Sequence, residues 1–257
     1  MAYKKPNTFT YIELHRHLFP QSSKAYGKLN AYFKNFKEKA IIQKIQGVSV
    51  YTLDPTSHLF YLICHSFKHF LHSGFGIRQV CDLCMFANAY GSKIDWDLIY
   101  NWCQDIHGEY FAAALFKIAK KYLIFDEKKA HMSTCWKQIE VDEGPILMDI
   151  LDAGVFGGRT LSRQHSSLMT LGAAETGQYR KKSFQGWFRT LFPTMKNMKG
   201  KYPQLQEKPF LLPWAWLDRI LKYVKESKKQ DNTMKESVQI SKQRIDLMIQ
   251  YKIIKER

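Results

Sequence analysis

The chain has 257 residues, is 45% hydrophobic and carries a formal charge of +16, so it has enough apolar material for one large domain or two small ones. We expect no membrane-spanning segment and no signal peptide, because no run of about 18 apolar residues occurs and no apolar stretch follows the first residues. Five cysteines in mostly apolar, helical context predict reduced thiols in a cytoplasmic protein rather than a disulfide framework.

The positive charge is concentrated at the two ends of the chain. Residues 1–50 carry 9 Lys or Arg against 2 Asp or Glu, and residues 161–257 carry 20 against 8. The middle of the chain is near neutral or acidic. Such a surplus favours a polyanionic partner, which could be a nucleotide, nucleic acid or an anionic membrane surface. A solvated basic surface without a partner explains the charge equally well.

Two short strands are predicted near the start of the chain. Residues 8–14 alternate in polarity and place Tyr11, Glu13 and His15 on one face, while residues 47–53 have a β-branched centre. Between these strands, residues 24–44 are rich in lysine and carry apolar side chains at roughly helical spacing. We therefore expect a small β element made of residues 8–14 and 47–53.

An antiparallel helical bundle is predicted from residue 54 onward. Asp54-Pro55-Thr56 is a helix start, because Asp or Thr caps free N–H groups and Pro is tolerated in the first turn. Gly74 and Gly76 should end this helix. Further helices are predicted over residues 77–90, 96–106 (with Asp95 as the cap) and 109–124. Short loops between successive helices are typical of antiparallel bundles.

The second half of the chain gives weaker patterns. We expect a linker with little core over residues 126–145, a helix from Ile146 to Gly154, and a Ser-rich loop around residues 157–167. Amphipathic helices are predicted over residues 184–192, 214–225 and the last part of the chain, with a proline-rich extended connector at residues 201–214. The predicted fold class is mainly α (α+β), divided into residues 1–53, 54–225 and 226–257.

Five segments occur in an order that resembles a known family. They are "YIELHRHLF", "LDPTSHLFYLICHSFKHFLHSGFGIRQVCDLCMF", "IDWDLIYNWCQDIHG", "ILDAGVFGG" and "LFPTMKNMKGKYPQLQEKPFLLPWAWLDRI". Over residues 3–225, this series resembles an uncharacterised, nucleotidyltransferase-like family found in many bacteria, within the polymerase-beta-like superfamily. The resemblance implies transfer of a nucleoside monophosphate from an NTP to an unknown acceptor. It also implies a fold in which a helical region follows a small catalytic sheet.

The resemblance implies a catalytic site that is incomplete in this chain. Family members hold the phosphates on a Gly-rich turn and bind Mg²⁺ with an Asp-x-Asp pair, and a third carboxylate follows on the strand that Ile12-Glu13-Leu14-His15 resembles. Glu13 is thus the implied metal ligand and catalytic carboxylate. Because two Mg²⁺ ions need several carboxylates, we expect a truncated core that is inactive alone unless another chain supplies the missing half.

Other site residues follow from their place in the family pattern. Lys4 and Lys5, just before the strand of Glu13, are implied contacts for the triphosphate, and His15 lies on the same strand. His65, Arg78 and Asp82 occupy recurrent family positions. We expect them either to form a buried polar network that joins two helices or to contact the nucleotide or acceptor.

Several further motifs have a structural interpretation that we favour over a chemical one. His58, His65, His69 and His72 lie on one predicted helix, but the segment lacks the Glu of a zinc-protease motif and contains Lys68. Asp95-x-Asp97 reads as a cap and a first-turn acid, and Cys81-x-x-Cys84 as core residues. The segment "YRKKSFQGWFR" either binds phosphate and stacks a base or begins a buried amphipathic helix.

A second class of function remains open. A helical module without enzymatic activity could use its basic ends to bind a polyanion or a partner protein. We also expect an exposed sheet edge at residues 8–14, because no strands flank it in our prediction, and such edges favour homo-oligomers or a complementing chain.

Overall fold

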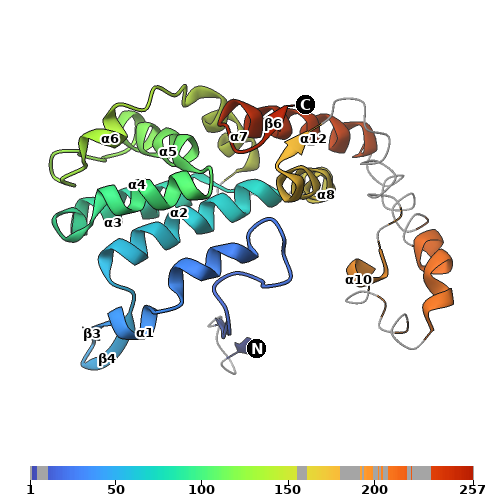
Figure 1. Cartoon of the computed structure of the whole chain (residues 1–257), viewed down its shortest axis with the longest axis horizontal. Helices are drawn as coiled ribbons and strands as arrows, with labels where there is room; N and C mark the ends of the chain where they lie inside the picture. The colour runs from blue at the N-terminus through green and yellow to red at the C-terminus, as the bar shows by residue number, and fades with distance from the viewer. Residues whose placement is uncertain are drawn as a thin grey trace.

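The structure is a computed structural model that describes residues 2–4, 11–154, 161–179, 192, 194–198, 202, 204, 208–218, 221 and 233–256. Most of these residues are helical, so the predicted mainly α (α+β) class is confirmed (Figure 1). No helix in the described part is long and apolar enough to cross a membrane.

The strands of the described residues pair two by two. β1 (Ala2–Lys4) pairs antiparallel with β2 (Tyr11–Glu13), β3 (Ile41–Ile45) pairs antiparallel with β4 (Val48–Thr52), and β5 (Gln178–Tyr179) pairs parallel with β6 (Lys255–Glu256). The prediction of one β element from residues 8–14 and 47–53 is therefore wrong. The expectation that no strand flanks β2 is wrong as well, because β1 lies beside it.

The β3–β4 hairpin replaces the end of the helical pattern predicted over residues 24–44. Gln46 and Gly47 have φ angles of 49° and 83°, which is the backbone of a tight two-residue hairpin turn. This turn and the β-branched residues around it outweigh the apparent helical spacing of Ile41. The helical part is shorter than predicted and consists of η1 (Gly27–Phe33) and α1 (Phe36–Lys39).

The helical bundle agrees closely with its prediction. Its first half consists of α2 (Pro55–His72), α3 (Ile77–Tyr90), α4 (Trp96–Asp105) and α5 (Glu109–Tyr122). The Asp54 carboxylate accepts hydrogen bonds from the N–H groups of Thr56 and Ser57, and Asp95 accepts one from Leu98, so both predicted caps are confirmed. α2 packs against α3, α4 and α8 and forms the centre of the apolar core (Figure 1).

Residues 126–145 are part of the core, so the prediction of a linker is wrong. The segment contains α6 (Thr134–Lys137) and the buried Trp136, which is 4% exposed. The indole N–H of Trp96 donates to the carbonyl of Ala130 at 2.8 Å, and that of Trp136 donates to the carbonyl of Trp96 at 3.0 Å. A few large apolar side chains thus bind a polar segment to the bundle.

The Ser-rich stretch is also different from its prediction. Residues 162–167 belong to α8 (Leu161–Thr176), which packs along α12 (Thr233–Gln250), while Gly157 and Gly158 lie outside the described residues. The hydroxyls of Ser166 and Ser241 donate to carbonyls of their own helices, at 2.7 and 2.6 Å. Serines that are satisfied in this way act as small side chains and let two helices approach closely.

The bundle is completed by α7 (Gly144–Ala153), which packs against α12. Ile245 and Met248 of α12 belong to the same apolar core cluster as α2. The predicted division into three domains stays a prediction.

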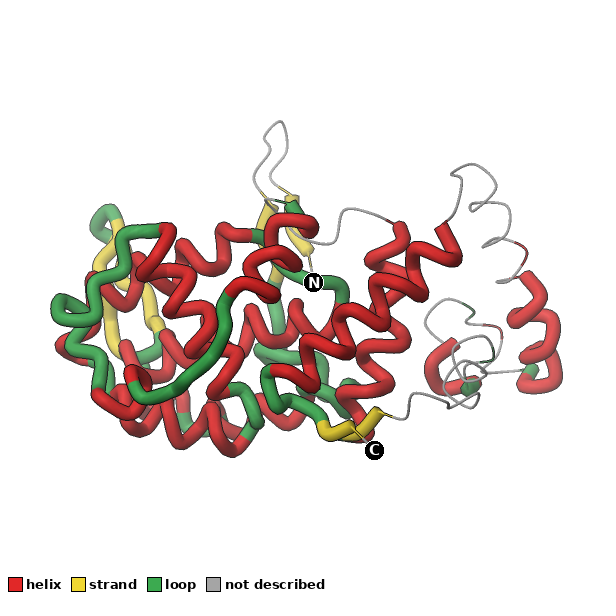
Figure 2. Tube along the Cα trace, turned by 90° about the horizontal axis from the view of Figure 1, so that it is seen from above, coloured by secondary structure: helices red, strands yellow, loops and turns green. Residues whose placement is uncertain are grey.

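A separate small cluster lies between α10 (Met195–Met198) and the region from η4 (Pro209–Leu211) through the helical residues 212–218. Both figures show this region apart from the bundle (Figures 1 and 2). The predicted extended connector is wrong from residue 209 onward, because Pro209 begins η4 and Pro213 lies in a first helical turn, where proline is tolerated. Of the predicted helix over residues 184–192, residues 184–191 lie outside the described residues.

Candidate functional site

An open groove of about 840 Å³ lies over the segment that follows β2. Its walls come mainly from residues 17–36, and Glu175 of α8 adds one carboxylate at its rim. The polar and charged lining residues include His17, Lys24, Lys28 and Lys34, and all four are exposed. The groove is therefore a basic surface with room for a ligand the size of a nucleotide.

Asn30 holds the walls of the groove in place. Its amide N–H₂ donates to the carbonyls of Phe19 and Gly27, at 2.8 and 3.0 Å, and its amide oxygen accepts from the N–H of Phe19 at 3.1 Å. Phe19 is fully buried, and its ring lies 6.1 Å from that of Phe33. The Asn30 side chain thus fixes the backbone of Phe19 and Gly27, and Phe33, which packs on Phe19, lines the groove.

The predicted residues of the first strand lead toward this groove. Glu13 is the last residue of β2 and precedes the lining residue His17 by four positions, but its side chain lies outside the described part of the structure. The same holds for the side chain of Lys4 in β1, and Lys5 lies wholly outside the described residues. His15 is exposed, between β2 and the groove. The roles of these residues stay predictions.

The predicted buried network of His65, Arg78 and Asp82 is wrong. Arg78 and Asp82 are exposed on α3, and neither makes a hydrogen bond or ion pair within the part of the chain that the structure describes. Asp82 acts on His65 only through its charge. The side chains face water because the side of α3 that packs on α2 is taken by Val80, Leu83 and Cys84.

His65 does belong to a row of rings that begins at the groove. Tyr61 lies 6.2 Å from Phe33 and 5.8 Å from His65, and His65 lies 4.6 Å from His69. Burial lowers the pKa of His58, His65, His69 and His72, and Lys68 lowers it further for the last three. For His69 the pKa falls to about 4, and its neighbours His65 and His72 contribute. These four histidines are therefore mainly neutral at pH 7.

This row should make the stability of the protein depend on pH. His69 has a pKa of about 4 when folded and 6.5 ordinarily, so its contribution is complete above pH 6.5 and is lost as the pH falls toward 4. We expect His69→Gln to lose less stability over this interval than the wild type, by on the order of 1 kcal/mol after allowance for solvent screening. Urea unfolding at a series of pH values measures the difference, with the exposed His131→Asn as control. If the free energy of unfolding changed with pH in the same way for the wild type and His69→Gln, the lowered pKa of His69 would be contradicted.

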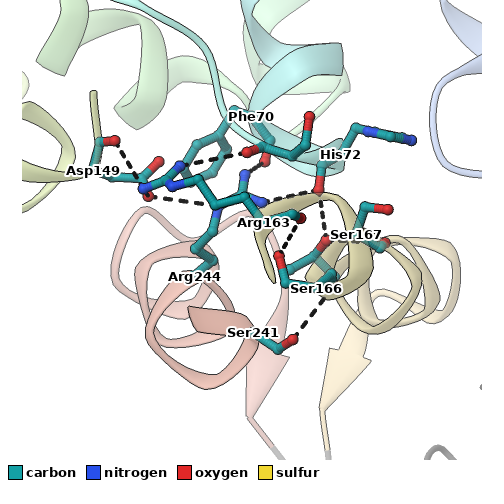
Figure 3. A network of polar contacts seen from close by, with 10 residues as sticks. Phe70, His72, Asp149, Arg163, Ser166, Ser167, Ser241 and Arg244 are labelled. Carbon is teal, nitrogen blue, oxygen red and sulfur yellow. Dashed lines mark hydrogen bonds and ion pairs between the residues drawn. The ribbon is translucent and has the colours of Figure 1, made fainter. Parts of the chain in front are cut away.

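A buried charge network, absent from the sequence prediction, lies where α2 ends (Figure 3). Asp149 of α7 accepts from Arg163 of α8 at 2.7 Å and forms an ion pair of 3.6 Å with Arg244 of α12. Arg244 also donates to the carbonyls of Phe70 and His72, and Arg163 donates to that of Ser73. These are carbonyls at the end of α2, which no helical N–H can reach.

The network combines two positive charges and one negative charge with the negative end of a helix dipole. Burial lowers the pKa of Arg244 to about 10, Asp149 opposes this change, and Arg163 adds to it, so Arg244 stays charged at pH 7. Gly74, with a φ of 97°, leaves room for the Arg163 guanidinium, which a Cβ at that position would overlap. The network joins four helices, so its role is to hold the bundle together.

The described residues do not offer a metal site. No group of three or more His, Cys, Asp or Glu within them could hold an ion. Asp97 instead accepts the S–H of Cys135 at 3.3 Å, as a first-turn residue of α4. Cys84 is buried and Cys81 is half-buried on α3, and both are free thiols. The basic groove is therefore the candidate ligand site among the described residues.

A comparison with known families finds a match in the first half of the chain. Residues 1–123 match the model of a family described as an uncharacterised nucleotidyltransferase. The similarity supports the general class that the sequence motifs predict. The matched part contains both N-terminal hairpins, most of the groove lining and α2 to α5, whereas Glu175, α8 and α12 lie beyond it. No curated protein and no solved structure matches the chain.

Proposed function

We propose that the chain binds the triphosphate of a nucleotide in the basic groove, as part of the transfer of a nucleoside monophosphate to an unknown acceptor. The observation that carries the proposal is the position of the groove, which begins four residues after Glu13 in the part similar to nucleotidyltransferases. Lys24, Lys28 and Lys34 supply three positive charges, against the single carboxylate of Glu175 among the described lining residues. Triphosphates are attracted by such a cluster of ammonium groups.

Nucleotide binding and nucleotide transfer are distinct parts of this proposal. Transfer in this class depends on Mg²⁺ held by several carboxylates. The described residues do not assemble such a set, so they do not fit the metal, and Glu13 alone could not hold a pair of ions. We therefore assign binding to the groove, and expect little transfer by this chain unless another chain completes the carboxylate set.

Neutralising the groove lysines should weaken binding of ATP. For the triple variant Lys24→Gln, Lys28→Gln and Lys34→Gln we expect an affinity about 10- to 100-fold lower, because each exposed ammonium–phosphate contact contributes on the order of 1 kcal/mol. Isothermal titration of the full chain with ATP and Mg²⁺ measures the affinity. Adenosine, titrated in the same way, should bind far more weakly, since it lacks the phosphates.

The matched control removes the same charge elsewhere. Lys93, Lys128 and Lys242 are exposed and lie outside the groove lining, so their triple change to Gln alters the net charge equally. This control should bind ATP like the wild type. If both triple variants bound ATP with equally lowered affinity, the affinity would depend only on net charge. The groove would then not be the nucleotide site. A Glu13→Gln variant tests separately whether that carboxylate contributes when Mg²⁺ is present.

A further inference from the structure

An exposed apolar stripe lies on one face of the region that follows Pro209. Phe210, Trp214, Leu217 and Leu221 follow one another at intervals of four, three and four residues. Trp214 and Leu217 lie on one side of the described helical residues 212–218, and Phe210 of η4 and the helical Leu221 continue the same spacing before and after them. Their exposed fractions are 75%, 62%, 59% and 66%, so all four are largely in water. We call these four residues the 210–221 stripe.

The opposite face of the same region is already packed. Ala215 is buried against Met198 of α10, with Leu211, Leu212 and Trp216 around it. The hydroxyl of Tyr202 donates to the carboxylate of Asp218 at 2.8 Å, which adds a polar contact on this side. Figures 1 and 2 show the region standing apart from α2 to α8. The small cluster therefore fixes the helix with the 210–221 stripe directed away from its own packing.

The sequence around the stripe is strongly basic. Residues 194–229 contain nine Lys or Arg and three Asp or Glu, so this part of the sequence carries a formal charge of +6. Helices that combine Trp, Phe and Leu on one side with many basic residues lie at the interface of anionic membranes. There the aromatic rings sit at headgroup level, and the basic side chains are attracted by the negative surface potential.

We infer that the 210–221 stripe docks the protein on an anionic lipid surface. A second copy of the chain is a poorer occupant, because each copy carries a charge of +16 and the basic regions would repel each other. A nucleic acid would satisfy the charge but leave four large apolar side chains without a partner. A bilayer interface offers both the apolar depth and the negative charge. The inference concerns a surface distinct from the groove, so it stands or falls independently of nucleotide binding.

Co-sedimentation of the full chain with lipid vesicles tests the inference. We expect binding to phosphatidylcholine vesicles that contain phosphatidylserine, weaker binding to phosphatidylcholine alone, and a decrease with added salt. The double variant Leu217→Ser and Leu221→Ser should lower the partition onto anionic vesicles at least about tenfold, because two leucines leave the acyl boundary. Trp214→Ser should weaken it in the same direction, and circular dichroism shows whether each variant remains folded.

A matched control lies on α7. Met148 and Leu151 are 59% and 58% exposed, so Met148→Ser with Leu151→Ser removes a similar amount of exposed apolar surface at another place. This control should bind vesicles like the wild type. The inference is overturned if the wild type ignores anionic vesicles, if the stripe variants bind unchanged, or if the control loses binding equally. Sedimentation velocity that showed a dimer dissolved by the Leu217 and Leu221 changes would overturn it in favour of a second copy.

Discussion

Replacing Asp149 with asparagine should lower the free energy of unfolding by about 3–5 kcal/mol, the range for removing one partner of a buried ion pair. The change keeps the volume of the side chain and removes only its charge. The ion pairs of Arg163 and Arg244 with the Asp149 carboxylate would then be lost in the interior, where the two arginines are 5% and 1% exposed. For a domain whose total stability is about 5–15 kcal/mol, this loss is large.

The size of the effect follows from how the two arginines are held. Arg244 has its guanidinium on the carbonyls of Phe70 and His72, and its Cζ lies 5.6 Å from the ring centre of Phe70. It has no path to water that would keep those contacts. Arg163 is tied to both the carbonyl and the carboxylate of Asp149, at 3.0 and 2.7 Å. Because α2, α7, α8 and α12 all contribute, we expect the substitution to lower the stability of the whole bundle in one cooperative transition, rather than to unfold one helix by itself.

Urea unfolding followed by circular dichroism gives the free energy. Asp152→Asn is the control, since Asp152 lies on the same helix and is exposed, and its change should stay within about 0.5 kcal/mol. If Asp149→Asn unfolded like the control, the two guanidiniums would not depend on Asp149, and the network would be no more than a set of caps on α2.

The sequence could predict α2 to α5 because their signals are local. A cap residue, a proline in the first turn and apolar side chains three and four residues apart fall within one short window, as at Asp54 and Asp95. The buried network could not be predicted in this way. Asp149, Arg163 and Arg244 are separated by up to 95 positions in the chain. Both arginines also donate to backbone carbonyls, which no sequence pattern identifies.

The candidate site was predictable only in part. The positive charge of residues 1–50 favoured a polyanionic partner, and three lysines of this part of the chain, Lys24, Lys28 and Lys34, line the groove. The sequence does not show that the Asn30 side chain closes the loop over Phe19, because such a bond depends on tertiary geometry. The pattern of His65, Arg78 and Asp82 misled for a related reason. Charged residues that lie near one another in the sequence, on two neighbouring helices, need not point toward each other.

Replacing Gly91 with alanine should cost about 2–4 kcal/mol, although the backbone there suits any residue. Its φ and ψ angles are −53° and −37°, so a side chain adds no torsional strain. The obstacle is steric, because a Cβ at this position would overlap the Cα, carbonyl carbon and carbonyl oxygen of Ala130. These are backbone atoms, so they cannot rotate away, and overpacking of this kind typically costs about 1–3 kcal/mol.

A second loss adds to the first. The carbonyl of Ala130 accepts the indole N–H of the buried Trp96, and any shift of that carbonyl weakens the bond, which would cost about 1 kcal/mol more. Gly172→Ala is the matched control. Gly172 lies in α8 with no atom within 4 Å of its Cβ position, so this change should instead stabilise the protein by about 0.5–1 kcal/mol. Thermal and urea unfolding measure the change in stability for both variants. A loss for Gly91→Ala together with a gain for Gly172→Ala would show that residues 126–132 pack as part of the bundle. A Gly91→Ala protein as stable as the wild type would mean that they do not.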